Sequence, residues 1–314
     1  MTQIEKEIPS HWRKDVSLAS FTSWRIGGPA LYFAEPPDPS SLASDLRAGF
    51  DLQLPVFFIG GGSNILISDR GFPGLVVRYR DRSIRLHVEE DGRSARLRAG
   101  ANAALAGTAR AMAYRGWAGL EWAEGIPGTI GGAIVGNAGA FGGDISQVLL
   151  RLEILEKASK IIQWDPDRLS YGYRTSALKE NPSGDVLVLT GEFLLQSENP
   201  TELRRRMVHF SHKRRRSTPA KASCGSVFKN PPGEAAGRLI ESSGLKGKIC
   251  GNMMVSDIHA NYIVNQGDGK AVEALSLIRQ VRDTVFEKTG IVLRPEIRFI
   301  GFEEDDIGDI LSVV

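Results

Sequence analysis

The sequence lacks the features that mark several protein classes. It has only two cysteines, Cys224 and Cys250, which form no CxxC pair, so it offers neither a disulfide framework nor a zinc-binding set. The first fifteen residues contain no apolar core of a signal peptide. No stretch approaches the ~18–20 apolar residues of a membrane helix. These absences predict a cytoplasmic protein with no metal site and no membrane partner.

Two phosphate-binding motifs are also missing. No GxGxxG leads from a strand into a helix, so the usual dinucleotide fingerprint is absent. Gly247-Lys248 and Gly269-Lys270 lack both the upstream glycine and the following Ser or Thr of a Walker A motif. The sequence therefore argues against a P-loop ATPase or kinase.

The charge balance excludes little. The formal net charge is +2, with 24% charged and 42% hydrophobic residues, as in ordinary globular proteins. The basic clusters at 204–206 and 213–216 could neutralise nucleic-acid phosphates. We favour the alternative, a solvated basic helix that attracts a sugar diphosphate, and expect no nucleic-acid partner.

A length of 314 residues allows two or three compact units. Strands at 31–35, 56–59 and 75–80, with a helix from about residue 40, predict an α/β unit. A helix over about 103–115 should have Asn102 as its N-cap and end at Gly116. Further expected elements are strands at 148–156 and 186–195, a basic helix over 200–216, an amphipathic helix over 271–287 closed by Gly290, and a strand over 291–300.

Glycine is abundant and clustered. The chain has 35 glycines, about 11% against a usual value of about 7%. The run Gly60-Gly61-Gly62-Ser63-Asn64 directly follows an apolar strand. Its backbone amides could converge on a diphosphate, although a tight surface turn fits the same residues.

A second glycine-rich stretch runs from Gly125 to Gly142 and carries almost no charge. Its interspersed Ile, Val, Ala and Phe residues indicate burial against a large, flat, apolar partner. FAD has both a diphosphate and an apolar ring system, and we favour it over a loop that is buried on its own domain.

Three other segments hold polar side chains. Arg174 lies between aromatic and hydroxyl residues in YGYRTS, where a surface ion pair is the simplest reading. Ser226, Lys229 and Asn230 share the segment GSVFKNP, and no histidine is spaced to support a serine hydrolase. Glu296 falls on the face of its predicted strand opposite Ile297 and Phe299.

Taken in this order, the motifs closely resemble the UDP-N-acetylenolpyruvoylglucosamine reductase family, also called UDP-N-acetylmuramate dehydrogenase. The resemblance extends from FTSWRIGGPA at 21–30 to Glu296 and Gly301, and includes AGRLIE at 236–241 and His259-Ala260-Asn261. The short spacing between Arg174 and the strand near Gly191 resembles the subtype without a Tyr-bearing loop. Gly251-Asn252-Met253 and Arg294-Pro295 depart from the family pattern.

The resemblance implies an α+β protein with a two-subdomain FAD-binding fold of the vanillyl-alcohol-oxidase (PCMH) type and a C-terminal α+β substrate domain. The implied boundaries are 1–85, 86–200 and 201–314. It implies bound FAD, with NADPH and UDP-N-acetylglucosamine enolpyruvate as substrates. The oligomeric state stays open. A flavin oxidase that shares the FAD-binding fold is the alternative.

The resemblance also implies roles for single residues. Arg174 would stabilise negative charge, Ser226 would donate a proton and Glu296 would assist the enolate, while Lys229 and Asn230 would contact the substrate. An oxidase would need no such set. The implied FAD contacts are Gly60, Gly61, Gly62, Ser63, Asn64, Gly125, Ile126, Pro127, Gly128, Thr129, Gly132, Asn137, Ala138 and Gly139.

Overall fold

The computed structural model describes residues 7–180 and 185–312, so the first part of the N-terminal segment, residues 1–6, lies outside the described residues. The described chain forms two compact units. The first unit comprises residues 7–13, 32–61 and 74–214, and the second comprises 14–31, 62–73 and 215–312. The three-part boundaries implied by the family resemblance stay a prediction.

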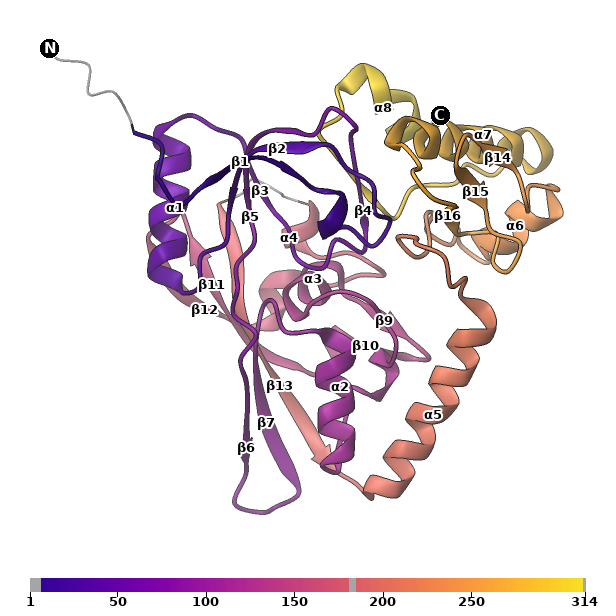
Figure 1. The fold of residues 1–314 in the computed structure, drawn as a ribbon. Helices are drawn as coiled ribbons and strands as arrows, with labels where there is room; N and C mark the ends of the chain where they lie inside the picture. The colour runs from indigo at the N-terminus through magenta and orange to yellow at the C-terminus, as the bar shows by residue number, and fades with distance from the viewer. Residues whose placement is uncertain (1–6, 181–184, 313–314) are drawn as a thin grey trace, which may run out of the picture. The chain divides into compact units, whose positions relative to one another are not determined.

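The largest sheet belongs to the first unit and is antiparallel. Its register places Leu97 opposite Phe193, and both side chains are buried. The helices α2 (Leu105–Tyr114) and α3 (Ile130–Gly136) contribute side chains to the same apolar core. Figure 1 labels both helices and most strands of this sheet. In spatial order the strands are β12 (Lys160–Trp164), β11 (Leu149–Glu156), β13 (Val186–Ser197), β7 (Ser94–Gly100) and β6 (Ile84–Val88), with β8 (Trp117–Ala118) at the end of β13.

A smaller sheet has the order β1-β2-β5-β3, and the chain passes between the units within β2 and β5. The helix α1 begins after Asp38, whose carboxylate accepts a hydrogen bond from the amide of Ser41 at 2.9 Å. An Asp at this position satisfies an amide that the first helical turn leaves unpaired. The bounds are β1 (Arg13–Ser17), β2 (Pro29–Ala34), α1 (Pro39–Asp51), β3 (Val56–Phe58) and β5 (Phe72–Val77).

The remaining elements of the first unit are short, apart from α5. They are the α-helices α4 (Ala177–Glu180) and α5 (Pro200–Ser217), the strands β9 (Gly139–Ala140) and β10 (Gly143–Asp144), and the 3-10 helices Glu121–Ala123, Ile145–Gln147 and Pro166–Leu169. The last three residues of α5 fall in the second unit.

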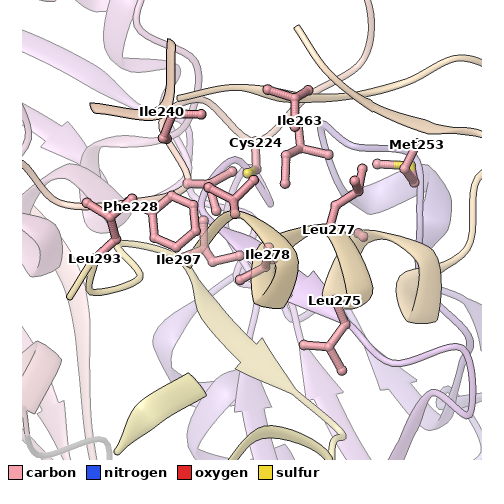
Figure 2. Close-up of a cluster of buried hydrophobic side chains, with 14 of the residues drawn as sticks. Cys224, Phe228, Ile240, Met253, Ile263, Leu275, Leu277, Ile278, Leu293 and Ile297 are labelled. Atoms are coloured by element: carbon pink, nitrogen blue, oxygen red, sulfur yellow. The ribbon is translucent and has the colours of Figure 1, made fainter. Parts of the chain in front are cut away.

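The second unit is built around α7 (Ala271–Thr289). The three- and four-residue spacing of apolar residues predicts one buried stripe from Val272 to Val285. Leu275, Ile278 and Val281 are buried as predicted, whereas the prediction is wrong for Val272, which is 59% exposed. Figure 2 shows Phe228, Leu293 and Ile297 gathered beside this helix. Elements that complete the unit are β4 (Ile65–Ile67), α6 (Ala236–Ser242), β14 (Ile249–Cys250), β15 (Met253–Val255), β16 (Ile263–Asn265), β17 (Arg298–Ile300), α8 (Glu304–Leu311) and the 3-10 helix Ala19–Phe21.

Two predicted element boundaries are wrong. The strand expected over 291–300 is reduced to β17, because only Arg298–Ile300 pairs with β4. Asn102 does not cap α2, which begins at Leu105 after Ala104. Asn102 is buried, and its backbone amide donates to the carbonyl of Asp81. No helix within the described ranges is long and apolar enough to cross a membrane.

Candidate active site

Two glycine loops of the first unit lie against each other. A Cβ on Gly61 would lie 2.7 Å from the Cα of Gly128, and a Cβ on Gly60 would lie 2.7 Å from the Oγ1 of Thr129. Other atoms do not approach a real Cβ this closely, so the contact needs glycine on the first loop. Within one unit, the fold therefore brings together parts of both runs that the sequence linked to a cofactor.

The backbone at this contact offers several amides. Among residues 7–180 and 185–312, the amides of Gly60, Gly61, Gly128 and Thr129 donate no hydrogen bond to another residue. Proteins normally pair such groups, and clustered unpaired amides form concave sites for anions. These residues therefore fit the diphosphate of FAD.

Polar side chains of the second loop hold the loop itself. The Oγ1 of Thr129 accepts a hydrogen bond from the amide of Gly132 at 3.4 Å and caps α3. Asn137 ends α3 with a positive φ of 43°. Its Nδ2 donates to the Gly172 carbonyl at 3.1 Å, and its Oδ1 accepts from the Ser146 amide at 3.1 Å. These side chains shape the surface that the backbone presents.

The rest of the second loop remains partly open to a ligand. Gly125, Pro127 and Gly132 are exposed. The half-buried members are Ile126, Gly128, Ala138 and Gly139. Most of the predicted contacts here can therefore be made only by backbone or by small apolar side chains.

The loop around Arg174 is anchored to the last turn of α3. The Tyr171 hydroxyl donates to the carbonyl of Ile134 at 2.9 Å, and the Ser176 hydroxyl donates to that of Val135 at 2.6 Å. A helix leaves such terminal carbonyls without internal partners. Burial raises the pKa of Tyr171 above its ordinary value, so the hydroxyl keeps its proton and its role as a donor.

Arg174 itself adopts a left-handed backbone conformation, with φ of 58°. Its Nη2 donates to the carbonyl of Gly139 at 2.5 Å, so its guanidinium lies at the second glycine loop. The Nζ of Lys179 donates to the Arg174 carbonyl at 2.8 Å. The first unit thus holds an arginine beside the backbone that fits FAD.

Ser226 and Glu296 come from two segments of the second unit that run side by side. The amide of Glu296 donates to the carbonyl of Val227 at 2.8 Å, and the amide of Lys229 donates to that of Arg294 at 2.8 Å. This antiparallel pairing fixes Glu296 against the residue that follows Ser226. Both Ser226 and Glu296 are half-buried.

Pro295 occupies a position of this pairing that needs no amide. It lies opposite Phe228, while the amides that donate across this pairing are those of Glu296 and Lys229. A proline without an N–H group therefore costs no hydrogen bond there. The departure from the family pattern at Arg294-Pro295 lies directly beside the segment that carries Ser226.

Glu296 has two further neighbours in the second unit. The Nδ2 of Asn64 donates to the Glu296 carbonyl at 3.2 Å, and the Arg298 amide donates to the Asn64 carbonyl at 3.0 Å. Burial, and secondarily the charge of Glu296, raises the pKa of the Cys224 thiol above its ordinary value. The side chain of Asn64, predicted to bind the cofactor, thus supports the Glu296 backbone; Gly62 and Ser63, buried and half-buried, precede it.

The predicted substrate residues have different surroundings. Lys229 is half-buried, and Asn230 is exposed with its Oδ1 accepting from the Ala236 amide at 3.0 Å at the start of α6. The other departure from the family pattern, at 251–253, joins β14 to β15. There the amide of Asn252 donates to the Glu273 carboxylate at 3.1 Å.

Sequence reasoning missed the residues that hold the candidate catalytic groups in place. In the YGYRTS motif Tyr171 and Ser176 are only neighbours of Arg174, and no motif includes Lys179. Asn261 lies in the family motif His259-Ala260-Asn261, which is the one sequence signal for any of these residues. Spacing along the chain does not identify which backbone group a side chain will contact.

Two family models match separate parts of this chain. Residues 30–164 match the family model described as FAD binding domain. Residues 218–300 match the model described as UDP-N-acetylenolpyruvoylglucosamine reductase, C-terminal domain. With the glycine contact, these matches define an FAD-dependent oxidoreductase, and they confirm the predicted PCMH-type FAD-binding fold with a C-terminal α+β domain.

Relatives along the whole chain define the family. The UDP-N-acetylenolpyruvoylglucosamine reductase of Chloroflexus aggregans is 46% identical, covering 95% of this chain and 100% of the relative. That of Rubrobacter xylanophilus is 42% identical, covering 91% and 94%. The crystal structure of the Thermus caldophilus reductase has a TM-score of 0.79 and 31% identity, covering 92% and 99%. The chain belongs to the UDP-N-acetylenolpyruvoylglucosamine reductase family.

Proposed function

We propose that this protein reduces UDP-N-acetylglucosamine enolpyruvate to UDP-N-acetylmuramate with NADPH, a step in making peptidoglycan precursors. Within the molecule, the observation that carries the proposal is a backbone hydrogen bond beside Ser226. The amide of Glu296 donates to the carbonyl of Val227 at 2.8 Å. That pairing supports a proton donor and a carboxyl group acting at one carbon. The names of the relatives supply the substrate class.

The first unit would hold FAD through backbone more than through side chains. The amides of Gly60, Gly61, Gly128 and Thr129 would bind its diphosphate. The remaining predicted contacts of this unit are those of Gly125, Ile126, Pro127, Gly132, Asn137, Ala138 and Gly139. Gly62, Ser63 and Asn64, also predicted to contact FAD, belong to the second unit. Bound FAD would supply the redox chemistry, the transfer of a hydride from NADPH to the enolpyruvyl group of the substrate.

Arg174 would stabilise the negative charge that hydride addition creates beside the substrate carboxylate. Its guanidinium stays charged at any physiological pH and can hold a planar oxyanion through two N–H groups. The contacts to Gly139 and Lys179 hold this side chain and its backbone before substrate arrives. Preorganisation of this kind removes the cost of reorienting the cation during the reaction.

Ser226 would donate its hydroxyl proton to the carbon that carries the carboxylate, and Glu296 would assist. A serine hydroxyl is a weak acid, so it needs a nearby positive charge or a relay to give up its proton. Lys229 and Asn230, on the same segment, would contact the substrate. We expect the protein to act in the cytoplasm and to need no nucleic-acid partner.

The absorption spectrum of the purified protein tests the proposal. Bound flavin should bleach when NADPH is added without oxygen, and it should reoxidise when UDP-N-acetylglucosamine enolpyruvate follows. Reduced flavin that this substrate does not reoxidise would favour an oxidase that acts on another substrate. A colourless protein that takes up no FAD would contradict the proposal outright.

The same assay tests the proton donor. Ser226→Ala should leave flavin reduction by NADPH intact and slow reoxidation by the substrate about 10²–10⁴-fold, the range that general acid catalysis contributes. Reoxidation at the wild-type rate would show that another group donates the proton.

A further inference from the structure

The side chain of Asn261 pairs with the backbone beside Ser226 as a neighbouring strand would. Its Nδ2 donates to the carbonyl of Phe228 at 2.8 Å, and its Oδ1 accepts from the amide of Phe228 at 2.9 Å. Its own carbonyl accepts from the amide of Val227 at 2.8 Å. Three hydrogen bonds from one residue therefore fix the two residues that follow Ser226.

The opposite edge of the same segment pairs with the backbone of Glu296. The carbonyl of Val227 accepts from the Glu296 amide at 2.8 Å, so the segment lies between Asn261 and Glu296. A shift of such a segment by one residue would turn its side chains to the opposite face. The register at Asn261 thus decides which side chain of this segment stands nearest to Glu296.

The surroundings make these bonds strong. Asn261 is 3% exposed and Phe228 1% exposed. A buried carbonyl or amide that loses its partner keeps the full cost of its removal from water. Asn261 is itself held, since its amide donates to the Nδ1 of His259 at 3.2 Å. The segment therefore has one stable register while Asn261 is present.

We propose that Asn261 is a positioning residue for Ser226, setting where the serine hydroxyl stands relative to Glu296. This inference rests on the proposed role of Ser226 as proton donor. Asn261 acts through the backbone of Val227 and Phe228, and its own polar side-chain atoms are engaged by that backbone. Its removal should harm the proton-transfer half of the reaction and spare the reduction of the flavin.

The chain contains a matched control for this role. Asn265 is also buried in the second unit, and its Nδ2 donates to the carbonyl of Trp24 at 3.1 Å. Its Oδ1 accepts from the amides of Gly267 and Gly269 at 2.9 and 3.0 Å. None of these bonds involves the Ser226 segment. A change of either asparagine to aspartate keeps the acceptor and replaces a buried donor with a second oxygen.

The experiment compares the two half-reactions in Asn261→Asp and Asn265→Asp. With the FAD-loaded proteins, the rate of flavin bleaching by NADPH should stay within about threefold of wild type in both. Reoxidation by UDP-N-acetylglucosamine enolpyruvate should slow about 10²-fold in Asn261→Asp alone, the size expected when a reacting group is misplaced by about 1 Å. In a Ser226→Ala background, Asn261→Asp should cause no further slowing.

Other outcomes would overturn the inference. Equal slowing of both half-reactions in Asn261→Asp, or equal effects of the two asparagine variants, would reduce Asn261 to a purely structural residue. Should Asn261→Asp not fold, Asn261→Ser, which leaves room for a bridging water, takes its place with the same expected pattern. If Ser226→Ala itself reoxidises at the wild-type rate, the proposed proton donor fails, and that result is distinct from a failure at Asn261.

Discussion

The two units carry their candidate functional groups by opposite means. In the first unit the candidate surface is backbone: Gly60 and Gly61 approach the second glycine loop, and their amides donate no hydrogen bond to another described residue. In the second unit the proposed reacting groups are side chains, on two segments that pair through the backbone of Val227 and Glu296. A cofactor that stays bound can be held by fixed amides, whereas a proton must be delivered by a side chain in a set register. The difference predicts different responses to mutation.

Among changes in the first unit, the largest effect should follow the loss of Arg174, its one proposed catalytic side chain. Arg174→Ala should lower the rate of substrate reduction about 10²–10³-fold, as the loss of an oxyanion-stabilising donor does. The flavin spectrum should be retained. Because the guanidinium also binds the Gly139 carbonyl, a variant that simply loses FAD would show that Arg174 is structural. The rate of substrate reduction by Arg174→Lys, which keeps the charge, should lie between the rates of the wild type and of Arg174→Ala.

The backbone contact can be tested by adding one methyl group. Gly61→Ala would place a Cβ 2.7 Å from the Gly128 Cα, an overpacking that costs about 1–3 kcal/mol and should appear as weaker FAD binding. Gly136→Ala is the control, because its Cβ would meet nothing within 4 Å. Titration of the flavin-free proteins with FAD measures both. Equal affinities would mean that the two loops do not form the diphosphate site.

A smaller effect should follow the removal of a single anchor of the Arg174 loop. Tyr171→Phe deletes the hydroxyl that pairs with the Ile134 carbonyl, and the free energy of unfolding should fall by about 1 kcal/mol. Tyr114→Phe, at a 57% exposed side chain, should change stability by less than about 0.5 kcal/mol. Urea denaturation gives both values. A Tyr171 variant as stable as wild type would mean that the anchor is replaced by water.

The smallest effect should be a pH dependence in the second unit. Burial lowers the pKa of His259 below its ordinary value of 6.5, with Lys246 lowering it further and Glu241 opposing. The folded protein thus prefers the neutral imidazole, whose Nδ1 accepts from the Asn261 amide. This contribution is complete above pH 6.5 and is lost as the pH falls towards the folded pKa.

The slope of stability against pH from this residue should be at most about 1.4 kcal/mol per pH unit, and smaller because the side chain is partly exposed. Denaturation at several pH values between 5 and 8 measures it. His259→Gln should flatten the profile, whereas the exposed His87→Gln should leave it unchanged. A wild-type slope in His259→Gln would assign the effect to other groups.

The sequence predicted the long elements well and the irregular ones poorly. The helices α1, α5 and α7 and the strands β11 and β13 lie close to their predicted ranges. The periodic pattern over many residues marks such elements. The strand over 291–300 also alternates, yet only its last three residues find a ladder partner in β4. Alternation shows which side chains can be buried, and pairing depends on residues more than two hundred positions away.

The candidate site shows the same division. The glycine runs, Arg174, Ser226 and Glu296 could be chosen from the sequence, because their family motifs are local. The side chains that hold them could not. Lys179 reaches the Arg174 carbonyl, and Asn64 reaches the Glu296 carbonyl across 232 positions. The motif of Asn64 predicts a contact with the cofactor. In the structure its side-chain amide donates to the carbonyl of Glu296.

By itself, the sequence determined the family, the FAD-binding fold class and the chemical types at the site, because these follow from local composition and ordered motifs. Only the tertiary structure decided that Gly61 meets Gly128, that Tyr171 and Ser176 close the end of α3, and that Asn261 pairs with the segment after Ser226. These contacts join backbone groups to other backbone groups or to side chains from elsewhere in the sequence. Apart from proline, which has no N–H group, every residue carries the same backbone donor and acceptor, so the sequence does not mark which amide or carbonyl a given side chain will bind.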